Sequence, residues 1–183
     1  MTARVLAVLL ACVALAAVLF DRKALREGFS LKVPPGWRPT TLTTFESYPA
    51  LNSQECIDFK GCEYKGQFQR TGTKRHTLNW VKDRNIASVH SADFSKFKGD
   101  KEWVRVKFRG RTLDARVMDA CADKDTKSKK DCTDNKKKSG FLIDLEKYTA
   151  ARLGYSDGSH EAIYKMIAAK DVIKANLRGS KMY

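Results

Sequence analysis

Residues 117–121 read Val-Met-Asp-Ala-Cys, and residues 141–145 read Phe-Leu-Ile-Asp-Leu. Each run is short and apolar apart from one acid, Asp119 in the first and Asp144 in the second. A carboxylate inside an apolar strand costs free energy unless it is paired or lies at a cleft. The two aspartates are therefore candidate site residues. The alternative is that each one caps a helix or accepts backbone N–H groups, since Asp144 directly precedes a predicted helix.

The sequence around these runs predicts a β-rich domain. Apolar and charged residues alternate over 102–108 and again over 112–119, with Arg-Gly-Arg between them, which is typical of a β-hairpin. Further strands are predicted at residues 40–48, 86–90, 141–145 and 164–167, short helices at 77–85 and 146–153, and a polar loop at 120–139. These elements predict a mainly β chain, a small barrel with one or two short helices.

An apolar leader precedes this region. Residues 5–20 are all apolar and would form a helix about 24 Å long at ~1.5 Å per residue. That length lies between a signal-peptide core and a helix that spans the ~30 Å hydrocarbon layer. We expect a signal-anchor or transmembrane helix over residues 1–20, a proline-containing stalk over 21–39 and the barrel domain over 40–183.

The leader also predicts where the barrel lies. We expect a single-pass anchor in a membrane through residues 5–20, with the barrel on the oxidising, extracytoplasmic side. The alternative is secretion after cleavage near Ala16, where small residues offer a cleavage signal. Arg4 precedes the span and Arg22 follows it, so the orientation stays open.

Four of the five cysteines lie in the predicted domain. Cys12 belongs to the leader, whereas Cys56/Cys62 and Cys121/Cys132 form two local pairs. An even number of cysteines in a chain that enters the secretory route favours disulfides. Zinc is the rival, but neither pair has the two-residue spacing of a zinc knuckle. Of the three pairings that four cysteines allow, we expect the two local ones.

The chain is strongly basic, with 35 Lys and Arg against 21 Asp and Glu and a net charge of +14. Residues 124–138 form a lysine cluster that would attract polyanions. Interleaved aspartates and the lack of an aromatic residue for base stacking favour a solvated loop, so nucleic acid is not expected as a partner. The candidate residues for binding an acidic surface are Lys127, Lys129, Lys130, Lys136, Lys137 and Lys138.

The chain has few residues of the types that build metal sites, catalytic triads or cofactor sites. Three histidines, His76, His90 and His160, are few for a His-built metal site or a catalytic triad. The sequence has no phosphate-binding glycine motif. We therefore expect no metal and no cofactor. Several aromatic residues are candidates for a sugar platform, although most are expected in the core: Tyr48, Phe59, Tyr64, Phe68, Trp80 and Trp103.

With the helix that ends at Leu153-Gly154, the two aspartate runs resemble the double-psi β-barrel superfamily, which includes expansins, barwin, rare lipoprotein A and family-45 endoglucanases. The upstream segment with Glu55-Cys56 and Gly61-Cys62 is similar to the cysteine-containing first part of expansin-like members. The resemblance covers roughly residues 40–167. It implies a small six-stranded double-psi β-barrel.

The resemblance also implies roles for individual residues. Asp144 matches the proton donor of the endoglucanases, and Asp119 matches an acid that lines the same groove. The endoglucanase base belongs to an aromatic-Asp-Cys-Cys motif, and Glu46 in Thr-Phe-Glu-Ser-Tyr is the only acid near that place here. Ile143 replaces the aromatic or histidine that usually precedes the second Asp. These departures favour a non-catalytic binding or structural module; the alternative is an expansin-like or lytic polysaccharide-active protein that uses Asp144 as acid, with Asp119 or Glu46.

The leader followed by Glu27-Gly28-Phe29 also resembles membrane-anchored virion proteins of large DNA viruses. That resemblance implies a minor, capsid-associated structural protein. Such a protein would assemble with protein partners through its basic surface and its stalk, and the barrel would then lie within a virion.

Overall fold

The computed structural model describes residues 33–173 of the chain. The predicted apolar helix, the cleavage signal near Ala16 and residues 21–32 of the predicted stalk lie outside the described residues. Among residues 33–173, no helix combines the length and apolar character needed to cross a membrane.

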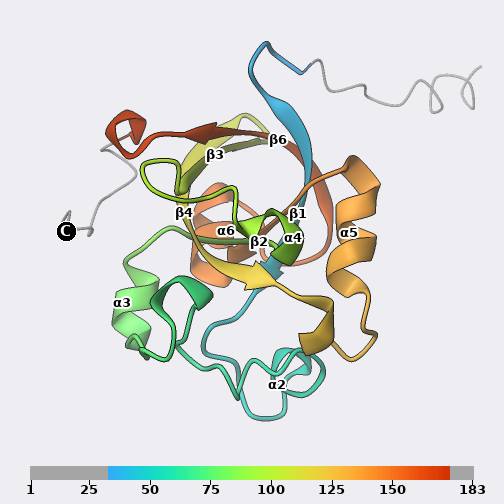
Figure 1. Cartoon of the computed structure of the whole chain (residues 1–183). Helices are drawn as coiled ribbons and strands as arrows, with labels where there is room; N and C mark the ends of the chain where they lie inside the picture. The colour runs from blue at the N-terminus through green and yellow to red at the C-terminus, as the bar shows by residue number, and fades with distance from the viewer. Residues whose placement is uncertain (1–32, 174–183) are drawn as a thin grey trace, which may run out of the picture. The chain divides into compact units, whose positions relative to one another are not determined.

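Six strands close into a barrel (Figure 1). Their order around the barrel is β1-β5-β2-β4-β3-β6, in which only β3 and β4 are neighbours both in sequence and in space. The strands are β1 (Arg38–Phe45), β2 (Ile86–His90), β3 (Trp103–Phe108), β4 (Arg111–Cys121), β5 (Leu142–Glu146) and β6 (His160–Ile167). The predicted mainly β barrel is confirmed.

The barrel mixes parallel and antiparallel pairings. β1 runs parallel to β5, and β2 runs parallel to β4, whereas the other four pairings are antiparallel. Parallel neighbours cannot be joined by a tight hairpin, so the chain must cross the barrel between them. The first strand therefore lies beside a strand about a hundred residues later in the sequence, Thr43 opposite Asp144.

The predicted hairpin is confirmed and builds much of the barrel core. Val104 and Val106 of β3 and Ala115 and Val117 of β4 are fully buried. Because side chains alternate between the two faces of a strand, these residues fill the interior while Lys107 stays exposed. β4 continues to Cys121, two residues further than the sequence pattern predicts.

The described residues contain five α-helices, of which α5 and α6 have seven residues or more. α5 corrects the predicted loop over 120–139. Aspartates in its first turn and lysines in its last turn complement the helix dipole, and Gly140 ends it with a left-handed φ of 84°. The helices are α2 (Gln54–Asp58), α3 (Leu78–Lys82), α4 (Ser91–Phe94), α5 (Asp131–Ser139) and α6 (Lys147–Leu153).

Candidate functional site

Four neighbouring strands bring four polar side chains into one pocket. Asp144 of β5 lies opposite Thr43 of β1 on one side and opposite Ser88 of β2 on the other. A register shift between Ala87 and Ser88 then places Ser88 opposite Asp119 of β4. All four polar residues line a pocket of about 470 Å³. The structure therefore brings together the two aspartates predicted from the sequence.

Asp144 is a buried carboxyl, with 9% of its surface exposed. The Thr43 hydroxyl donates a hydrogen bond of 2.9 Å to Asp144 Oδ1. Burial raises the pKa of Asp144 to about 7, the hydrogen bond from Thr43 opposes this shift, and the charge of Asp119 adds to it. Because Thr43 occupies Oδ1, a proton on Asp144 belongs on Oδ2. The predicted helix-capping alternative is wrong, since Glu146 caps α6 by accepting the N–H of Tyr148.

Asp119 is held by backbone groups. The N–H of Gln69 donates to Asp119 Oδ1 over 2.9 Å, so the alternative of backbone hydrogen bonding applies to this aspartate. Burial raises the pKa of Asp119, while the N–H groups of Gln69 and Ala120 lower it. Burial is thus the larger influence at both aspartates, and both pKa values are raised.

A third carboxyl in the pocket, Glu55 of α2, escaped prediction from the sequence. Burial raises the pKa of Glu55 to about 8, with Asp144 adding to the shift. Gly61 makes room for it, because an added Cβ there would lie 3.0 Å from Glu55 Cγ. The only signal in the sequence is its place between Ser53, which caps α2, and Cys56. The local sequence pattern does not indicate that helix α2 lies near Asp119 and Asp144.

Glu46, the third candidate acid, lies at the edge of the same pocket. Its carboxylate forms an ion pair of 3.2 Å with Lys147, and its backbone N–H hydrogen-bonds Glu55. Glu46 is therefore partly neutralised by the chain itself.

Only some of the predicted aromatic candidates reach the pocket. Phe59, Tyr64 and Phe68 line it, and Tyr64 is 42% exposed. Tyr48 and Trp80 pack instead with buried Phe68 in a second core cluster. Of the predicted candidates, only Phe59 and Tyr64 therefore remain for a sugar platform.

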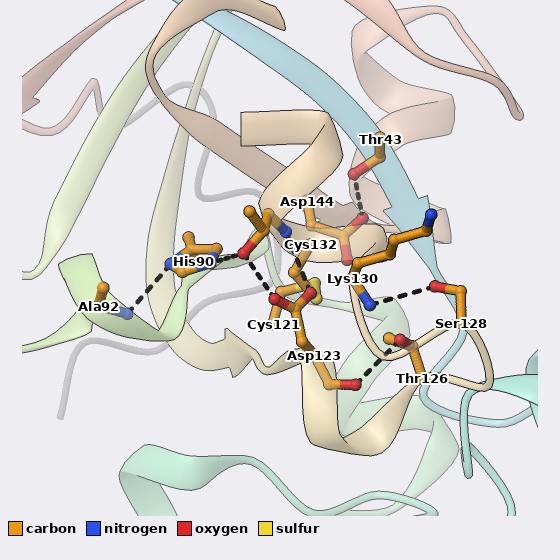
Figure 2. Close-up of a disulfide and its surroundings, with 11 residues drawn as sticks. Thr43, His90, Ala92, Cys121, Asp123, Thr126, Ser128, Lys130, Cys132 and Asp144 are labelled. Atoms are coloured by element: carbon orange, nitrogen blue, oxygen red, sulfur yellow. Dashed lines mark hydrogen bonds between the residues drawn. A yellow bond between two sulfur atoms is a disulfide. The ribbon is translucent and has the colours of Figure 1, made fainter. Parts of the chain in front are cut away.

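Both predicted disulfides are confirmed, Cys56–Cys62 and Cys121–Cys132. The second bond joins the end of β4 to α5, and both of its cysteines line the pocket together with Asp144 (Figure 2). Neither pair is available as zinc ligands. Among residues 33–173, no group of three or more His, Cys, Asp or Glu side chains is arranged to hold a metal ion.

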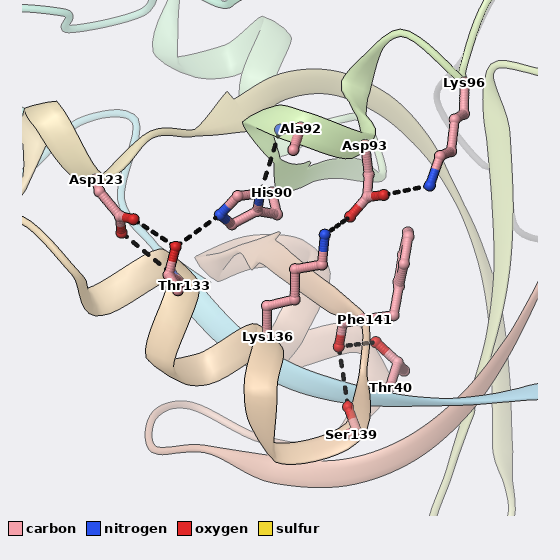
Figure 3. A network of polar contacts seen from close by, with 10 residues as sticks. All are labelled: Thr40, His90, Ala92, Asp93, Lys96, Asp123, Thr133, Lys136, Ser139 and Phe141. Carbon is pink, nitrogen blue, oxygen red and sulfur yellow. Dashed lines mark hydrogen bonds and ion pairs between the residues drawn. The ribbon is translucent and has the colours of Figure 1, made fainter.

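The lysine cluster lies on and before α5, and part of it is used inside the fold. Lys136 forms an ion pair of 2.7 Å with buried Asp93 of α4 (Figure 3). Asp123 accepts hydrogen bonds from the backbone and hydroxyl of Thr133, whose hydroxyl also contacts His90. These contacts hold α5 against the barrel. The remaining candidates are exposed: Lys127, Lys129, Lys130, Lys137 and Lys138.

Comparison with known proteins finds the fold alone. No family model matches the chain, and no curated protein matches its sequence. An apo expansin from Clavibacter michiganensis is 13% identical over 73% of this chain and 51% of that chain, with a TM-score of 0.43. The endoglucanase Cel45A from the blue mussel Mytilus edulis is 12% identical over 80% of this chain and 88% of its own, with a TM-score of 0.49. A papain inhibitor from Streptomyces is 13% identical over 74% of this chain and 99% of its own, with a TM-score of 0.40.

The domain is a closed six-stranded β-barrel of mixed parallel and antiparallel pairings. Its match spans about half of the expansin, so it corresponds to only part of that protein. The expected virion role and membrane anchor receive no support from these similarities.

Proposed function

We propose that the barrel is a polysaccharide-binding module that holds a glycan chain in the pocket at Asp144. The observation that carries this proposal is the position of Asp144, a buried carboxyl in the lining of a pocket with Asp119 on a nearby strand. With a pKa raised to about 7 by burial, Asp144 holds a proton in mildly acidic solution. A protonated carboxyl donates to the hydroxyl, ring and bridging oxygens that a polysaccharide offers.

The walls of the pocket suit a sugar chain. Tyr64 and Phe59 supply aromatic surface, on which the apolar face of a pyranose ring can pack. Thr43 fixes the orientation of the Asp144 carboxyl through its hydrogen bond of 2.9 Å. Aromatic surface beside a few oriented polar groups is the usual composition of a small-ligand site.

Cleavage of the glycan is a second candidate function, and the pairing of Asp144 with Asp119 favours it. Glycosidases use one carboxyl as proton donor and another as base or nucleophile, with environments that separate their pKa values. Asp144 has the environment of the donor. Asp119 accepts backbone N–H bonds that oppose the rise of its pKa by burial, and Glu46 is the other candidate base.

We further propose that the barrel works on the oxidising side of a membrane. Its two disulfides support this location, because such bonds persist in oxidising compartments. Lysines that extend into solvent, among them Lys129, Lys130 and Lys137, would then contact acidic partners or surfaces. The mass of the chain recovered from its native source would reveal whether residues 1–16 are retained.

The binding proposal is tested with the full chain on insoluble cellulose, chitin and peptidoglycan at pH 5.5. We expect retention on at least one of them and a loss of about tenfold or more in affinity for Asp144→Asn. Asp100→Asn is the matched control, because it removes an exposed carboxylate outside the pocket. Release of new reducing ends, abolished by Asp144→Asn, would favour cleavage. Lack of retention on every polymer would overturn both candidates.

A further inference from the structure

We propose that the pocket selects glycans that carry free amino groups, such as polymers of glucosamine. This inference rests on the proposed function and names the substrate class of the same site. Three observations support it. Among residues 33–173, the residues that line the pocket are mostly acidic, few of these acids form ion pairs, and the hydroxyl of Ser88 makes no hydrogen bond.

The lining of the pocket is acidic, although the chain as a whole is basic. Six acidic residues line it, against a single basic residue, Lys124. A local surplus of one sign in a concave site attracts ligands of the opposite sign. The six acids are Glu46, Glu55, Asp119, Asp125, Asp131 and Asp144.

Only the acids at the edge are paired with basic groups. Glu46 is 3.2 Å from Lys147, and Asp125 is 3.6 Å from Lys60. Glu55, Asp119 and Asp144 form no ion pair with any residue between 33 and 173. The innermost acids therefore lack a cation, which a bound ammonium group would supply.

Ser88 is a second and independent sign of a ligand. It is 3% exposed and lines the pocket between the strands that carry Asp144 and Asp119. Within the described part of the chain its hydroxyl makes no hydrogen bond, and it is not among the enclosed side-chain atoms that lack a partner, so it is open to the pocket. A hydroxyl both donates and accepts, so it can hold an ammonium N–H or a sugar hydroxyl.

The same lining discriminates among glycans. An N-acetylated sugar has no charge to offer the acids, and a uronic acid would add a carboxylate to a pocket that already holds several. Like charges brought together in a partly buried site repel. A free amine adds Coulomb attraction to hydrogen bonding, so we expect amino glycans to bind more tightly than acetylated ones, and uronic glycans to bind least.

Proton release is a signature of this mode of binding. Asp144 is faced by Asp119 and Glu55, and Tyr155 also lies near it. Glu55 is faced by Glu46 as well, while Lys124 is the one cation in the lining. An ammonium ligand lowers the pKa of Asp144 and Glu55 from about 7 and 8, so protons leave on binding. A neutral glycan needs the protonated carboxyls as donors, so its binding releases none.

The test is calorimetry of the full chain at pH 6 with three hexasaccharides, of glucosamine, N-acetylglucosamine and galacturonic acid. We expect the glucosamine hexamer to bind at least about tenfold more tightly than the acetylated one, with net proton release measured in buffers of different ionisation enthalpy. Glu55→Gln and Ser88→Ala should each reduce this preference several-fold. Asp100→Asn should leave it unchanged.

The outcomes separate this inference from the proposed function. Equal affinity for the glucosamine and acetylated hexamers would overturn the amine preference and leave polysaccharide binding intact. Failure of every hexamer and polymer to bind would overturn both. If hexalysine competes as well as the glucosamine hexamer and releases as many protons, the pocket recognises ammonium groups without the sugar, and the inference is wrong. Circular dichroism of each variant verifies that it is folded.

Discussion

Gly61 packs directly against Glu55, and a Cβ added to the glycine would lie 3.0 Å from both Cγ and the backbone oxygen of the glutamate. The N–H of Gly61 also donates to that oxygen, and the Cys56–Cys62 disulfide closes the same loop. The missing side chain of Gly61 is therefore what allows α2 to bring Glu55 to the pocket.

Gly61→Ala should move Glu55 away from the pocket. Steric overlap with Glu55 and Pro49 is expected to cost about 1–3 kcal/mol of stability and to weaken glycan binding. Gly99→Ala is the control, because Gly99 has open space around it and lies outside the pocket lining, so only its left-handed backbone is strained. Urea denaturation and glycan retention measure the two effects. Normal binding by Gly61→Ala would mean that the position of Glu55 does not matter.

The stability of the domain should fall as the pH rises from about 4 to 8. Glu146 is fully buried, and burial raises its pKa to about 7. In this range the native state keeps a proton that the unfolded chain has released, so unfolding becomes easier as the pH rises. Burial of Asp144 and Glu55 acts in the same direction.

Glu146→Gln should remove part of this pH dependence, on the order of 2–3 kcal/mol between pH 4 and 8. The glutamine oxygen can still accept the N–H of Tyr148, which caps α6. Urea denaturation at pH 5 and pH 8 measures the slope for both proteins. An unchanged slope in the variant would show that Glu146 is not ionised differently in the two states.

Removing the buried ion pair of Asp114 should be the most damaging single change outside the pocket. Asp114 is fully buried, accepts two hydrogen bonds from Arg105 at 2.7 and 2.9 Å, and accepts the N–H of Ile173 at 2.7 Å. Asp114→Ala leaves the Arg105 charge without its partner, at a cost of about 3–5 kcal/mol. Thermal unfolding measures the loss. The double variant Arg105→Leu/Asp114→Leu should recover much of the lost stability, because it removes the arginine together with its partner and leaves no unpaired charge.

The two disulfides should differ in their contribution to stability. Cys121–Cys132 closes a sequence separation of 11 residues, against 6 for Cys56–Cys62, so loop entropy alone makes its loss about 0.5 kcal/mol more costly. Replacement by paired serines, followed by urea denaturation, compares them. Alkylation without reductant should modify none of these four cysteines. Modification of any of them would contradict the pairing.

Local pattern in the sequence was enough to predict several parts of the protein. The alternation over residues 102–119 predicted the β3–β4 hairpin, because strand pairing between adjacent segments depends on nearby residues. Asp119 and Asp144 were noticeable because each interrupts an apolar run. The local disulfides followed from their short spacing. Helix α5 was missed because its polar composition resembles a loop, although its charges and Gly140 fit a helix.

The position of Ser88 between the two aspartates, and that of Glu55 in the same pocket, depend on tertiary contacts. These neighbours come from parallel and antiparallel pairings between strands far apart in sequence, whose register no local pattern encodes. The protonation of Asp144 and Glu55 is equally a property of the fold, since burial and mutual repulsion raise their pKa values. The local sequence pattern is enough to identify Asp119 and Asp144 and the strands that carry them. Folding brings Asp119, Asp144 and Glu55 into one pocket, where none of them forms an ion pair with a residue between 33 and 173.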